Sequence, residues 1–125
     1  MKFREFKTSS GKKALSGKDA ASNEKLIEQV QANEIVLHTA APGSPFVNIK
    51  SAKPTASDVK EAAVFCAKYS QAWKKAKVKK DVLVHLFKGK DIYKNKAMKL
   101  GTFGVKKHKK MIVKKEDILN FENKK

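Results

Sequence analysis

The chain has 125 residues, which predicts one domain, and it carries 29 Lys and Arg against 12 Asp and Glu, a net charge of +17. Hydrophobic residues make up 41% of the sequence and include seven Phe, which excludes a wholly disordered chain and predicts a packed core. No apolar stretch approaches the roughly 20 residues of a membrane span, and no apolar signal segment opens the chain. The single cysteine excludes an intrachain disulfide. We therefore expect a cytoplasmic protein.

The first half of the chain predicts strands around one helix. Alternating aromatic and charged side chains favour a strand at the start, and a β-branched apolar stretch favours a central strand before the Pro42-Gly43 turn. Asp19 is the predicted N-cap of the helix, because its carboxylate can accept hydrogen bonds from the first free backbone N–H groups. The predicted elements are strands at 2–7, 13–16, 34–39 and 46–50 and a helix from 19 to about 32.

The second half predicts the longest helix, followed by further strands. Thr55 with Asp58 three residues later is close to a capping box, and Cys66 falls on an apolar face of small residues that would pack against a sheet. Polarity alternates along 79–88, with Val84 on one side of the predicted strand and His85 on the other. The predicted elements are a helix from 55 to about 77, strands at 79–88, 102–106 and 110–114, and a short helix at 116–121.

Together these elements predict an α+β fold, a mostly antiparallel sheet with one long packed helix and one or two shorter helices. The sequence contains no internal repeat and no low-complexity linker. We therefore expect a single domain at 1–121 and a basic C-terminal tail at 122–125.

Positive charge is concentrated in the second half of the chain. Residues 1–67 carry 10 basic and 7 acidic groups, a net charge of +3, whereas residues 68–125 carry 19 basic and 5 acidic groups, a net charge of +14. This asymmetry predicts an anionic partner, and nucleic acid is favoured over a membrane because no basic amphipathic helix with an exposed apolar face is evident. The alternative is that many of the lysines only solvate the surface.

The type of basic residue predicts how nucleic acid would be recognised. Only Arg4 among the 29 basic residues is arginine, and lysine lacks the planar fork that contacts base edges bidentately. We therefore expect contacts with the phosphate backbone. The predicted phosphate-binding residues are Lys18, Lys74, Lys75, Lys106, Lys107, Lys109 and Lys110, and a polar edge is predicted from Asp19, Asn23, His38 and Ser44.

Motifs for catalysis and metal binding are weak. Residues 11–19 are superficially similar to a phosphate-binding P-loop, but the spacing is one residue too long and Asp19 replaces the required Ser or Thr. His38, His85 and His108 are scattered without metal-ligand spacing, so we expect no metal and no cofactor. We expect a binding module and not an enzyme. Two alternatives stay open: a tRNA-processing or tRNA-modifying enzyme with His38 and Asp19 as an acid–base pair, and a non-specific DNA-binding protein.

Short motifs follow one another in a characteristic order over about residues 3–118. They are Arg4-Glu5-Phe6 with Ser10-Gly11, Gly17-Lys18-Asp19-Ala20 with Asn23-Glu24, Leu37-His38 with Pro42-Gly43-Ser44 and Val47-Asn48-Ile49, the Ala-rich segment 61–73, and Leu100-Gly101-Thr102-Phe103 with the basic turn after it. This ordered set resembles the NFACT-R domain, which occurs in large ribosome quality-control factors and as small stand-alone proteins.

The resemblance implies RNA binding, to tRNA or ribosomal RNA in translation, and it implies no established catalytic reaction. Expected partners are therefore RNA and the ribosome, with the oligomeric state left open. One position departs from the family pattern, because many members have His after Pro-Gly-Ser and this chain has Pro45. Any function of that histidine is absent from this protein.

Overall fold

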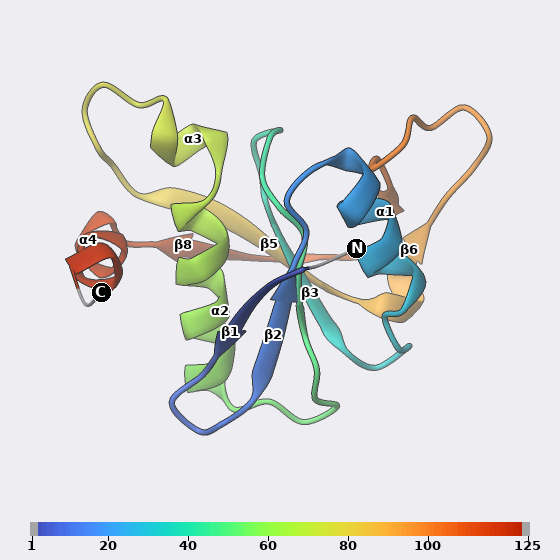
Figure 1. Cartoon of the computed structure of the whole chain (residues 1–125), viewed down its shortest axis with the longest axis horizontal. Coiled ribbons are helices and arrows are strands. Elements are labelled where there is room, and N and C mark those ends of the chain that lie inside the picture. Colours follow the sequence, from blue (N-terminus) through green and yellow to red (C-terminus); the bar gives the residue numbers. More distant parts are fainter. Residues whose placement is uncertain (1–2, 124–125) are drawn as a thin grey trace.

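Short strands of alternating polarity pair into a six-stranded antiparallel sheet in a computed structural model that describes residues 3–123 (Figure 1). The strand order is β1-β2-β4-β3-β5-β8, and β6 and β7 form a separate ribbon. The strands are β1 (Arg4–Lys7), β2 (Lys13–Ser16), β3 (Ile35–Thr39), β4 (Val47–Ile49), β5 (Val82–Lys88), β6 (Ile92–Tyr93), β7 (Gly104–Val105) and β8 (Lys109–Val113). The helices are α1 (Ala20–Glu28), α2 (Ala56–Lys68), α3 (Gln71–Lys74) and α4 (Lys115–Asn123), and the fold is α+β as predicted.

One face of the sheet, the closed face, is packed by α2 and α4, which lie to the left in Figure 1. Small residues let α2 approach the strands closely, and Ala62, Ala63 and Cys66 are fully buried there. Val84 points into the same core, as its alternation with His85 predicts. The predicted small-residue face of the helix is therefore confirmed, and it makes the larger of the two cores.

The opposite face, the open face, is covered only in part. Leu26 of α1 and Phe87 of β5 form a smaller core together with residues of the β6–β7 ribbon. Beyond that core, Lys110 and Ile112 of β8 point to solvent, and Ile112 is 61% exposed. The sheet thus presents an uncovered area beside α1.

The predicted helix N-caps Asp19 and Thr55 are both present, and the capping-box partner of Thr55 also anchors the β1–β2 hairpin. Thr55 and Asp58 form the predicted capping box at the start of α2. The Asp58 carboxylate also accepts a 2.6 Å hydrogen bond from the hydroxyl of Ser10. This hydrogen bond, followed by the one from Thr55, lowers the pKa of Asp58 to about 2. The hairpin turn is therefore tied to the helix by a carboxylate that stays ionised at neutral pH.

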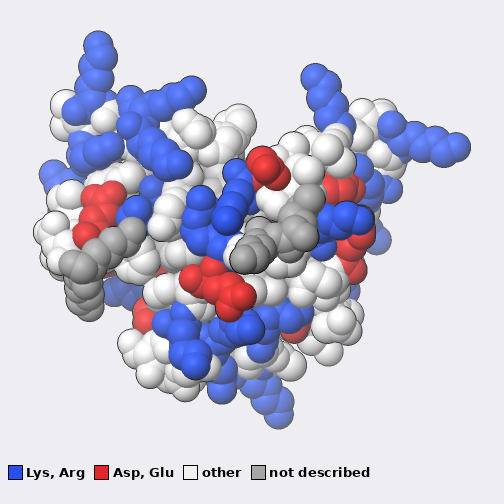
Figure 2. Space-filling view, in the orientation of Figure 1, with Lys and Arg blue, Asp and Glu red and all other residues white. Residues whose placement is uncertain are grey.

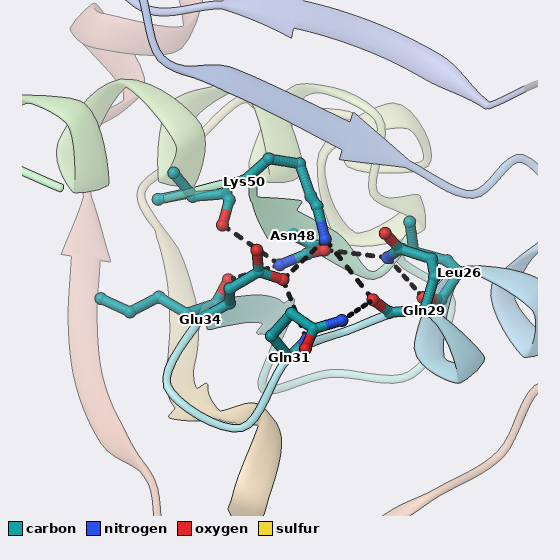
Figure 3. Close-up of polar contacts among 8 residues, drawn as sticks. Leu26, Gln29, Gln31, Glu34, Asn48 and Lys50 are labelled. Carbon is teal, nitrogen blue, oxygen red and sulfur yellow. Dashed lines mark hydrogen bonds and ion pairs between the residues drawn. The ribbon is translucent and has the colours of Figure 1, made fainter. Parts of the chain in front are cut away.

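A polar network at the C-terminal end of α1 joins this helix to the sheet (Figure 3). The Gln29 amide donates to the Leu26 carbonyl at 2.6 Å and to Asn48 Oδ1 at 2.9 Å. Lys50 Nζ lies 2.7 Å from Glu34 Oε1, and both side chains are largely buried. The network fixes where α1 ends and how the chain enters β3.

Two predicted helix ends are wrong, and each has a local cause. The first helix ends at Glu28 and not near residue 32, because the Gln29 side chain caps it. The second ends at Lys68 and not near residue 77, because the Ser70 hydroxyl bonds the Ala67 carbonyl and the Trp73 N–H and begins α3.

Smaller corrections concern the strands and the C-terminus. The strand predicted at 102–106 is reduced to Gly104–Val105. Within the predicted tail, 122 and 123 continue α4, and 124–125 lie outside the described residues. No helix within residues 3–123 has both the length and the apolar character needed to cross a bilayer.

Candidate nucleic-acid interface

A cleft of about 550 Å³ runs from the C-terminal end of α2, across the end of the sheet, onto the uncovered part of the open face. Its walls come from the start of α1, the Pro42-Gly43 turn, α3, β5 and the loop 100–103. Figure 2 shows a notch between the two upper lobes of the molecule, with basic side chains gathered over α3 and the loop after it. The site therefore joins segments that are far apart in the sequence.

Three cations surround one tyrosine at the α2 end of the cleft. The Arg4 guanidinium carbon lies 3.9 Å from the centre of the Tyr69 ring, and the ammonium groups of Lys68 and Lys74 lie at 4.2 Å and 5.8 Å. No ion pair among residues 3–123 involves any of these cations. We call Arg4, Lys68, Lys74 and Tyr69 the Tyr69 cluster; it is a concentration of positive charge that lacks a counterion within the described fold.

Arg4 is held in a defined orientation within this cluster. One guanidinium N–H donates to the Gly17 carbonyl at 3.4 Å, and the guanidinium carbon lies over the Tyr69 ring. The remaining N–H groups have no acceptor among the described side chains and backbone groups. A planar donor fixed in this way can bind a phosphate with little loss of side-chain entropy.

At the other end of the cleft lies an aromatic wall, made by His38, Phe46 and Phe103. The His38 and Phe46 rings are 4.4 Å apart between centroids, and Phe46 contacts Phe103 edge to face at 5.5 Å. His38 Nδ1 donates to the Thr39 carbonyl at 2.7 Å, which leaves Nε2 as an acceptor. Burial lowers the pKa of His38, with the Thr39 bond opposing and His85 adding to the shift, so the ring is neutral at physiological pH.

The three histidines, scattered in the sequence, lie side by side in the structure. His38 and His85 are directly opposite each other on β3 and β5, and His108 stacks on His85 with a centroid distance of 4.1 Å. Burial lowers the pKa of His85, and the charges of His108 and Lys110 lower it further. Antiparallel register, which the sequence spacing does not reveal, produces this row.

Three residues of the predicted polar edge line the cleft but are used mainly by the fold. Asp19 Oδ1 accepts from the backbone and hydroxyl of Ser22, which lowers the pKa of Asp19, and this carboxylate forms no hydrogen bond or ion pair with His38. Asn23 Oδ1 accepts from the Phe46 N–H at 3.3 Å. Ser44 is buried and donates its hydroxyl to the Pro45 carbonyl. The proposed acid–base pair is therefore not assembled in this structure.

The predicted lysines divide into separate groups. Lys18 and Lys74 line the cleft, whereas Lys75 lies on the other side of α3. Lys110 is opposite His85 in the β5–β8 register and so lies on the open face next to the cleft. The other three, Lys106, Lys107 and Lys109, line a second hollow at the far end of the same strands.

The loop at the rim of the cleft is held in place by two charged residues. Glu24 Oε1 accepts the Gly101 N–H at 2.7 Å and the Lys94 ammonium at 3.1 Å, and the Gly101 bond is the main reason that the pKa of Glu24 is lowered. Lys94 also donates to the carbonyls of Lys99 and Thr102. Gly101 has a φ of +80°, and a Cβ there would lie 2.8 Å from the Cα of Ala20. The loop therefore docks on α1 by its backbone.

Several side chains that define the cleft were not among the predicted site residues. They include Arg4, Phe46, Tyr69, His85 and Phe103. Arg4 stands out in the sequence as the one arginine among the basic residues, whereas His85 and Phe103 were noted there as parts of a strand pattern and of a motif. Residues 3–123 contain no group of three or more His, Cys, Asp or Glu that could hold a metal ion, and the free Cys66 is buried in the closed-face core.

Comparisons with known proteins agree with this architecture. The sequence model described as "NFACT protein RNA binding domain" matches residues 2–107. The C-terminal part of the fibronectin/fibrinogen-binding protein from Streptococcus suis superposes with a TM-score of 0.82 at 21% identity, covering 96% of this chain and 49% of that one. This chain thus spans about half of that structure, and the likeness shows the fold alone. No curated protein matches the chain.

Proposed function

The chain belongs to the NFACT RNA-binding domain family, and we propose on this basis that it binds structured RNA of the translation apparatus, a tRNA or a ribosomal RNA site. The proposed setting is translation or ribosome-associated quality control in the cytoplasm. Binding requires no cofactor in this proposal, because the contacts are electrostatic and come from the chain's own cations.

The observation that carries this proposal is the Tyr69 cluster, three cations that meet no carboxylate within the described fold. Like charges held together repel one another, and a bound phosphate removes that repulsion. Lys18 adds a further positive group on the wall of the cleft, which Arg4 and Lys74 also line. Asp19 is the one acidic residue among the described cleft-lining residues.

Lys110, which lies on the open face opposite His85, extends this surface toward the other lysines of the basic turn 106–110. Val105 lines the cleft, and His108 stacks on His85, which also lines it. An RNA backbone in the cleft can therefore continue past the histidine row to Lys110 and the turn. Contacts of this kind depend on phosphate positions and on the shape of the RNA, which fits the scarcity of arginine.

The proposal is tested by measuring affinity against salt concentration. We expect a tRNA or a ribosomal RNA fragment to bind with an affinity that falls steeply as salt rises, by about 0.7–0.9 log units per phosphate contact per decade of salt. The quadruple substitution of Lys106, Lys107, Lys109 and Lys110 by Gln should weaken binding and reduce the slope by about 0.7–0.9 for each phosphate that the variant no longer binds.

A matched control removes four positive charges elsewhere. Lys7, Lys25, Lys53 and Lys60 are exposed and line neither the cleft nor the hollow beside the basic turn. Their substitution by Gln should leave the slope nearly unchanged. Equal effects of the two quadruple variants would show that binding depends on net charge alone and not on the basic turn. Tighter binding of duplex DNA than of either RNA at matched salt would contradict the proposed partner.

A further inference from the structure

We propose that the cleft receives one unstacked nucleotide of the bound RNA, with its phosphate at the Tyr69 cluster and its base against the aromatic wall. This inference rests on the proposed function and adds to it a specific contact. Sequence-tolerant lysines explain attraction to RNA of any kind. A cleft with a charged end and an aromatic end explains why RNA with an extruded nucleotide would be preferred.

The charged end of the cleft matches a phosphate in geometry and in charge. Arg4 presents its remaining donors from a guanidinium whose carbon lies 3.9 Å from the centre of the Tyr69 ring. Lys74 reaches the same ring from α3, and Lys18, which precedes α1, also lines the cleft. A phosphate between these groups accepts charge-assisted hydrogen bonds from more than one direction.

The aromatic end matches the rest of a nucleotide. His38 and Phe103 line the cleft on either side of the buried Phe46 ring. Bases of single-stranded RNA stack on such side chains and hydrogen-bond through their exposed edges. His38 Nε2 is an acceptor without a partner in the described fold, because Nδ1 is bonded to Thr39, and it can accept from a base amino group or a ribose hydroxyl.

The cleft has room for a single nucleotide. About 550 Å³ lies in the range of roughly 300–1,000 Å³ that small-molecule sites occupy. A double helix keeps its bases stacked and paired, so only an extruded base, a loop or a strand end can enter. The docked loop at Gly101 and Thr102 forms one wall, and its bonds to Glu24 and Lys94 keep that wall in place before RNA arrives.

The test is an NMR titration of the full chain with each of the four nucleoside 5′-monophosphates and, separately, with inorganic phosphate. We expect at least one nucleotide to shift the His38 Nε2 resonance and the amides of Thr102 and Phe103. We expect that nucleotide to bind at least tenfold more tightly than inorganic phosphate. Equal affinity for phosphate alone, or shifts confined to residues outside the cleft, would overturn the inference.

Three variants separate the site from general electrostatics. Arg4→Lys keeps the charge and removes the planar fork, and should weaken nucleotide binding at least threefold. Thr102→Trp changes an exposed residue and fills the cleft, so it should abolish nucleotide binding with the fold preserved. Lys7→Gln removes a charge from the exposed side of the same strand as Arg4 and should bind normally.

The two proposals fail in different ways. If tRNA and ribosomal RNA bind with the expected salt dependence but nucleotides leave the cleft unchanged, the nucleotide site is wrong and the proposed function stands. If neither RNA binds at low salt, the proposed function is wrong. Undiminished nucleotide binding by a folded Thr102→Trp variant would also exclude the cleft as the site.

Discussion

The closed face of the sheet is sealed by two helices, whereas the open face is covered by α1 and a small ribbon over part of its area. On the closed face the side chains are apolar, from the small residues of α2 to Trp73, and on the uncovered part of the open face they are histidines, a lysine and aromatic edges. Stability and binding therefore come from different sides of one sheet. Changes on the closed face should unfold the protein, and changes around the cleft should alter what it binds.

The largest effect is expected from Trp73→Ala on the closed-face side. Trp73 is 2% exposed and its indole donates to Glu122, so removal leaves a large cavity and costs about 3–5 kcal/mol of unfolding free energy. Circular dichroism in urea measures this decrease, since the variant has no tryptophan fluorescence. Phe103→Ala, on the partly exposed aromatic wall, should lower the unfolding free energy less than Trp73→Ala does, and it should lower the affinity for nucleotides more. The reverse ranking would contradict the division of roles between the two faces.

A smaller effect is expected from Gly101→Ala at the rim of the open face. The positive φ and the contact of a new Cβ with Ala20 should cost about 1–3 kcal/mol, and the loop should leave α1 in preference to the whole chain unfolding. Hydrogen exchange would then rise at the amides of 100–103 and stay low in α2. Unchanged protection of these amides would show that the loop accepts the new side chain and stays docked on α1.

The pH dependence should be smaller still, and it should come from the histidine row. Burial lowers the pKa of His38 from 6.5. Burial also lowers the pKa of His85, and the charges of His108 and Lys110 lower it further. The unfolded chain therefore takes up protons at a higher pH than the folded chain, so stability falls as pH drops below about 6.5. Urea unfolding at pH 7 and pH 5 measures the decrease, which His38→Gln should reduce. An identical decrease in that variant would place the cause elsewhere.

The smallest effect is expected at Cys66, whose thiol should not react with a thiol reagent in the folded protein. Burial raises the pKa of this thiol to about 12, although weak hydrogen bonds oppose the shift, so almost no thiolate exists at pH 8. A thiol reagent should modify the unfolded chain within minutes and leave the native chain unmodified. Rapid labelling of the native protein would mean that the closed face opens readily.

Local chemistry made most of the fold predictable, and long-range pairing limited the rest. Asp19 and the Thr55–Asp58 pair were identified as caps because the residues that interact lie within four positions of one another. The ends of α1 and α2 depend on Gln29 reaching Asn48 and on Ser70 starting a new helix in place of continuing the old one. Helical periodicity carries no information on such contacts.

The candidate site was predictable only in part, for the same reason. Asp19, Asn23, His38 and Ser44 were predicted to form one polar edge, and they do line one cleft, together with Lys18 and Lys74 of the predicted phosphate-binding lysines. The partners Arg4 and Tyr69 meet only because β1 lies beside the end of α2. His85 and Phe103 reach the cleft through sheet register and through the docking of the 100–103 loop.

The buried ion pair between Lys50 and Glu34 has a practical consequence for handling the protein. Their side chains are 25% and 10% exposed, so dissolved ions screen this pair weakly. The attraction between surface lysines and phosphates, in contrast, weakens as counterions compete for both partners. Concentrated salt should therefore elute RNA from the purified protein while the polypeptide keeps its native conformation, and dilution alone should restore the complex.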